Sequence, residues 1–171
     1  MFEIVTSKDF YAMLVEDFDD FVAEPHSGRR ALHCAITAYH LHEWVWAEWL
    51  SRDKAARDAM GIAGRDKKYF LQWIEKYCVW FRLVQELANG SKHLGRNIGF
   101  DTLKVSGFGE GPFGIGPFGQ GYLLLDLGED ALEHRWQPAA HILEVVVRFW
   151  RDFFLKYIPS DDLPTSRHHI D

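Results

Sequence analysis

The sequence predicts a mainly α-helical protein: a four-helix up-and-down bundle with a β-hairpin and a glycine-rich loop inserted between the third and fourth helices. Two observations support this fold class. Apolar residues recur at helical spacing in four long segments, and the composition changes to glycine-rich over residues 107–121. Four long helices with one inserted hairpin favour the up-and-down arrangement. We expect residues 1–159 to form a single domain and residues 160–171 to be a loose tail.

The first two helices are predicted from capping signals and apolar periodicity. Thr6 can cap the first helix, and Pro25 and Gly28 end it. The second helix is predicted from Arg30 to Ser51. Its apolar stripe has the spacing of one helix face and consists of Leu32, Ile36, Tyr39, Trp46 and Leu50.

The third helix is predicted from Asp66 to Asn89. It follows a charged connector, residues 52–65, which we expect to hold at most one short helical turn. The dipeptide Asn89-Gly90 is a stop signal, because glycine adopts the left-handed conformation easily. The apolar face of this helix consists of Phe70, Ile74, Tyr77, Phe81 and Val84.

Two strands and one more helix are predicted in the rest of the chain. The strands cover Leu103–Ser106 and Tyr122–Leu127, and they form a hairpin that must pack on the helices to be stable. The last helix begins near Pro138, which suits a first helical turn, and Pro159 stops it.

Composition and charge exclude several classes of protein. The net charge of −6 argues against a basic surface for duplex DNA. Cys34 and Cys78 lie in apolar helical patterns, so we expect reduced core thiols. The first twenty residues carry many acids, unlike a targeting peptide, and no apolar run approaches the roughly 18 residues of a membrane span. We therefore expect a cytoplasmic protein that does not enter the membrane.

A polar stripe at the end of the third helix is the first candidate site. Arg82, Glu86, Asn89 and His93 would fall at i, i+4, i+7 and i+11 if the helix persisted, and Lys92 lies beside them. A histidine next to an amide, an acid and bases suits proton transfer or phosphate binding. The alternative is structural: Arg82 and Glu86 form an ordinary ion pair, and the remaining residues cap the helix.

This segment resembles the motif of HEPN-like domains. The motif is an Arg, often followed by Asn, with a His five residues after the Arg; Asn89 and His93 match its second and last positions, and Ala88 replaces the Arg. The resemblance implies a dimeric helical bundle, an RNA-related or defence role, and either ribonuclease or binding activity. The missing guanidinium implies that RNA cleavage has been lost, unless Arg82 or Lys92 substitutes for it.

The second candidate site lies in the second helix. His40 and Glu43 are spaced i, i+3, a spacing that di-metal bundles use in acid–histidine pairs, but only one pair is present and no further ligands can be assigned. We predict no metal site and no cofactor. Glu43 lies in the apolar stripe, so we expect it to have a partner: Arg82, Lys92 or a histidine on the neighbouring helix. The two form either a structural ion pair or part of a polar site with His40, Asn89 and His93.

The third feature is a repeat of Gly-Pro-Phe-Gly within residues 111–119. It cannot be a dinucleotide-binding loop, because no helix follows it and Pro112 removes a backbone amide. The repeat predicts tight turns that point Phe113 and Phe118 in the same direction, either onto the bundle or towards a partner.

These features give three functional hypotheses. The first is a binding domain, or a catalytically reduced one, that forms a homodimer and contacts RNA or a partner protein near Asn89 and His93. The second is a metal-independent ribonuclease that uses His93 with Arg82 or Lys92. The third is a metal or small-molecule binder near His40 and Glu43. The aromatic surplus, with 13 Phe, 7 Trp and 6 Tyr, and the repeat's phenylalanines suggest the homodimer.

Overall fold

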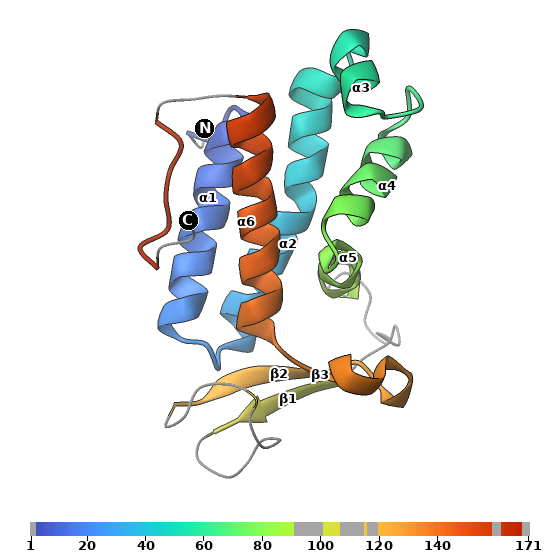
Figure 1. Ribbon diagram of the computed structural model, residues 1–171. Coiled ribbons are helices and arrows are strands. Elements are labelled where there is room, and N and C mark those ends of the chain that lie inside the picture. The colour runs from blue at the N-terminus through green and yellow to red at the C-terminus, as the bar shows by residue number, and fades with distance from the viewer. Residues whose placement is uncertain (1–2, 91–100, 107–114, 116–119, 159–161, 169–171) are drawn as a thin grey trace.

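The protein is mainly helical and has a small antiparallel sheet across one end of its helices (Figure 1). This computed structural model describes residues 3–90, 101–106, 115, 120–158 and 162–168. Helices α1, α2 and α6 run side by side, α4 and α5 follow one another along α2, and the strands lie at the lower ends in the view. The mainly helical class is therefore confirmed.

Helices α1 and α2 form an antiparallel pair. α1 spans Ser7–Ala23 and begins with a capping box, in which Asp9 N–H donates to Thr6 Oγ1 at 3.1 Å and Thr6 N–H donates to Asp9 Oδ2 at 2.8 Å. α2 spans Gly28–Val45 and continues through one π-helical turn, Trp46–Leu50. The predicted segment Arg30–Ser51 is thus helical from Arg30 to Leu50.

The predicted third helix is broken, so the prediction of one continuous helix is wrong. α4 spans Lys67–Tyr77 and α5 spans Phe81–Gly90, and α3, which spans Lys54–Met60, lies before them in the predicted connector. Between α4 and α5, Cys78 has an extended backbone with φ −127° and ψ 97°. The break keeps apolar residues buried on both sides of it while Val79 is turned outward and is 75% exposed. Apolar periodicity continues across the break, which is why the pattern hides it.

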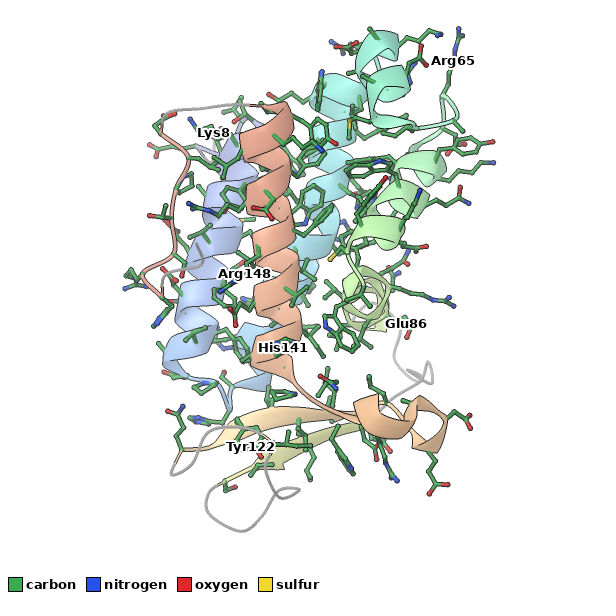
Figure 2. The ribbon with its side chains drawn as sticks, in the orientation of Figure 1. Lys8, Arg65, Glu86, Tyr122, His141 and Arg148 are labelled. Atoms are coloured by element: carbon green, nitrogen blue, oxygen red, sulfur yellow. The ribbon has the colours of Figure 1, made fainter. Side chains whose placement is uncertain are left out.

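The two predicted strands are present, and a third joins them. β1 (Asp101–Val105) pairs antiparallel with β2 (Tyr122–Asp126), and β2 pairs with β3 (Trp136–Pro138). Side chains alternate between the faces of β2: Leu125 belongs to the main core, and Leu124 to a smaller cluster on the opposite face. Tyr122 lies on that far side of the sheet (Figure 2).

Helix α6 closes the core. It spans Ala139–Tyr157, directly after Pro138, and its fully buried Trp150 donates its indole N–H to the Ala38 carbonyl at 2.9 Å. The main core takes residues from all the long helices, and aromatic rings from α4 and α6 contact one another within it. These contacts fix α4 against α6 although the break separates α4 from α5.

Part of the segment predicted as a loose tail lies against α1 (Figure 1). Asp19 of α1 is 4% exposed and accepts hydrogen bonds from the Ser166 hydroxyl at 2.5 Å and from Arg167 N–H at 3.0 Å. Burial alone raises the pKa of Asp19, but these bonds outweigh it and lower that pKa. The sequence does not show this contact, because 147 residues separate its two sides.

Candidate functional site

The polar cluster of α2 and α4 consists of His40, Glu43 and Lys67. His40 Nδ1 lies 3.1 Å from Glu43 Oε2, and Lys67 Nζ donates to Glu43 Oε1. The Glu43 side chain is 43% exposed, so it is not enclosed in the apolar stripe. Partial burial raises the pKa of Glu43, but hydrogen bonds from Lys67 and His40 outweigh it and lower the pKa to about 2. Glu43 is therefore an ionised acceptor in a surface ion pair.

His42 lies beside this cluster and is fully buried. Its Nδ1 is 2.5 Å from the Tyr39 carbonyl oxygen, and since a carbonyl only accepts, Nδ1 carries the proton. Nε2 is buried and has no hydrogen-bond partner among the residues that the structure describes. Burial lowers the pKa of His42 to about 4, so the ring is neutral near pH 7. It packs against the rings of Tyr39 and Phe81, at centroid distances of 4.8 and 6.2 Å.

Helix α5 carries the residues of the predicted polar stripe. Arg82 Nε lies 3.6 Å from Glu86 Oε1, and the Arg82 side chain is 78% exposed. Glu86 lies on the side of α5 away from α6 (Figure 2). Asn89 is partly exposed in the last turn, whereas Ala88, at the motif position of the Arg, is completely buried. The i, i+4 ion pair predicted for Arg82 and Glu86 is confirmed.

The structure does not pair Glu43 with Arg82, which is one of its expected partners. Glu43 is paired with Lys67 and His40, and Arg82 is paired with Glu86, so these two predicted site residues have separate partners. A hydrogen bond from Gln85 Nε2 to the Tyr39 hydroxyl, at 3.2 Å, joins α5 to α2, in addition to the ring contacts of Phe81 with Tyr39 and His42. The sequence offers no signal for either Lys67 or Gln85, because each reaches its partner from a different helix.

Four of the predicted site residues lie outside the described residues. They are Lys92, His93, Phe113 and Phe118. Ile115, which lies between the two phenylalanines in the sequence, is described: its carbonyl accepts a hydrogen bond from the Tyr122 hydroxyl at 2.5 Å, and it packs against the smaller cluster.

Neither the possible metal ligands nor the two cysteine thiols of the described residues are arranged for catalysis. Within residues 3–90 and the later described segments, no three His, Cys, Asp or Glu side chains are grouped to hold a metal ion. Cys34 and Cys78 are free and buried, and burial raises the pKa of both thiols. Neither sulfur is therefore prepared to act as a nucleophile. No helix in the described part of the chain is long and apolar enough to cross a membrane.

Comparison with known proteins gives no match to a protein-family model, to a curated protein or to a solved structure.

Proposed function

We propose that the chain is a HEPN-like binding domain without ribonuclease activity, and that it contacts a partner protein through the outer face of the α4–α5 junction. In this proposal the predicted four-helix bundle consists of α1, α2, α6 and, as its fourth member, the successive helices α4 and α5. The protein works in the cytoplasm, where its two free, buried thiols stay reduced.

The orientation of α5 carries the proposal. Ala88 is 0% exposed and shares the core-facing side of α5 with Phe81 and Val84. An arginine at this position would point into the core, so the matching site could not present a guanidinium to a phosphate. Loss of that group favours binding over cleavage.

The outward side of the same junction has the character of a protein-binding surface. Tyr77 and Val79 are 58% and 75% exposed, and the Arg82–Glu86 ion pair follows them on α5. Exposed apolar side chains bordered by charges are typical of protein interfaces. The paired acid and the net charge of −6 disfavour an RNA backbone as the ligand. The first partner to test is a second copy of the chain, because the related domains are usually dimers.

Light scattering tests this proposal with two matched variants. Val79 and Val5 are both 75% exposed, but Val5 precedes α1 and lies away from the junction. We expect a dimer at micromolar concentration for the wild type and for Val5→Asp, and a monomer for Val79→Asp, because a buried carboxylate opposes association. A monomeric wild type, or a Val79→Asp dimer as tight as that of Val5→Asp, would contradict the proposed surface.

A further inference from the structure

A pocket of about 210 Å³ lies where the sheet meets the ends of three helices. Its walls come from the first turns of α2 and α6, from the second half of α5, and from β1 and β2. The side chains that shape it include Ala31, Leu87, Leu123, Leu125 and Ile142. Ala31, Leu87 and Leu123 are partly exposed, while Leu125 and Ile142 belong to the core. The pocket therefore extends from the surface down to the core.

The lining is almost entirely apolar. Of the residues that form it, all of them in the described part of the chain, Thr102 alone has a polar side chain. Thr102 lies opposite Leu125 in the β1–β2 register, so both project to the same face of the sheet. Thr102 and Gly28 are exposed, which puts the opening of the pocket between β1 and the start of α2.

We propose that this pocket binds a small uncharged molecule with a single aromatic ring or a pair of fused rings and at most one hydrogen-bonding group. An apolar lining without charged side chains excludes ions, because nothing in it would replace their hydration. Cavities of about 150 Å³ with such linings accept benzene, so this volume suits roughly eight non-hydrogen atoms. The hydroxyl of Thr102 at the opening can pair with a single O–H or N–H of the ligand.

Three probes test the proposal on the full chain: ethylbenzene, indole and benzoate. We expect titration calorimetry and a rise in melting temperature to show binding of ethylbenzene and indole to the wild type. Benzoate has a similar size but a charge, and we expect no binding of it. Failure of both neutral probes to bind, or benzoate binding as tight as that of ethylbenzene, overturns the proposal.

Two substitutions locate the site. Ala31→Leu fills the pocket from α2, and we expect it to weaken indole binding at least about tenfold. Gly28→Leu acts at the opening: Gly28 and Ala31 share a helix face, and a Cβ at Gly28 meets no atom within 4 Å. The Gly28→Leu substitution improves helix propensity. Its effect on indole affinity therefore tests the site even if the Ala31→Leu variant does not fold.

The matched control is Ala55→Leu, at an exposed position of α3 far from the pocket. We expect indole affinity in this variant to stay within about twofold of the wild type. If indole binds Gly28→Leu and any folded Ala31→Leu as tightly as it binds the control, the pocket is not the binding site.

Discussion

Acidification should destabilise the protein through His42, and this loss should begin at a higher pH than the loss that comes from Glu43. Burial holds the pKa of His42 at about 4, against an ordinary value of 6.5 in the unfolded chain. Between these values the unfolded state binds the extra proton, so stability is fully present above pH 6.5 and is lost as the pH falls towards 4. The full difference between these two pKa values corresponds to roughly 3 kcal/mol.

The contribution of His42 to stability is best measured between about pH 7 and about pH 5. Across this range, the same two pKa values give a loss of roughly 2 kcal/mol in the free energy of unfolding. Glu43, whose pKa is lowered from 4.5 to about 2, contributes stability that is lost only at lower pH, as the pH falls below 4.5. The two effects can therefore be separated by pH.

Urea unfolding of His42→Phe measures the His42 contribution. Phenylalanine keeps a ring against Tyr39 and Phe81 but cannot titrate. Between about pH 7 and about pH 5, the free energy of unfolding should therefore fall by roughly 2 kcal/mol less for the variant than for the wild type. His33→Gln, at an exposed position of the same helix, is the control and should behave like the wild type. Parallel stability curves for the wild type and His42→Phe over this range would refute the reasoning, whatever their absolute stabilities.

Two further substitutions test the ion pair and the docked tail. Glu43→Gln removes a carboxylate that is 43% exposed, so we expect the free energy of unfolding in urea to fall by less than about 1 kcal/mol. A larger fall would show that the cluster of His40, Glu43 and Lys67 stabilises the fold more than a surface ion pair does. Asp19→Ala removes the acceptor of Ser166 and should cost about 2 kcal/mol and speed protease cleavage within residues 162–168. The control for it is Asp20→Ala, at an exposed position, and equal cleavage of the two variants would argue that Asp19 does not hold the tail.

Helix and strand positions follow from local signals, which is why the sequence predicts them well. Thr6 caps α1 as predicted, α2 and its π-helical turn cover the predicted segment up to Leu50, and β2 lies within the predicted strand. Each of these depends on residues only a few positions apart. Asp53 shows the limit: it caps α3, a complete helix of seven residues, where the sequence predicts only a short turn.

The features that the sequence misses depend on contacts between distant segments. The break at Cys78 contains neither glycine nor proline, so no local signal marks it. β3 has three residues and is a strand only because β2 lies beside it. These elements owe their conformation to tertiary packing rather than to local propensity.

In the candidate site too, contacts within one helix are predictable from the sequence, and contacts between helices are not. Spacing along one helix predicts the pairs His40–Glu43 and Arg82–Glu86, since both pairs lie within one turn. Lys67 belongs to another helix, and only the fold brings it to Glu43. The buried orientation of Ala88 likewise depends on how α5 packs.

Incubation of the purified protein with single-stranded RNA tests most directly whether this domain binds rather than cleaves. The buried position of Ala88 predicts no cleavage above background for the wild type and no difference between it and His93→Ala. Cleavage that the wild type performs and His93→Ala loses would contradict the account, because it would show that a working phosphate site exists without the motif arginine.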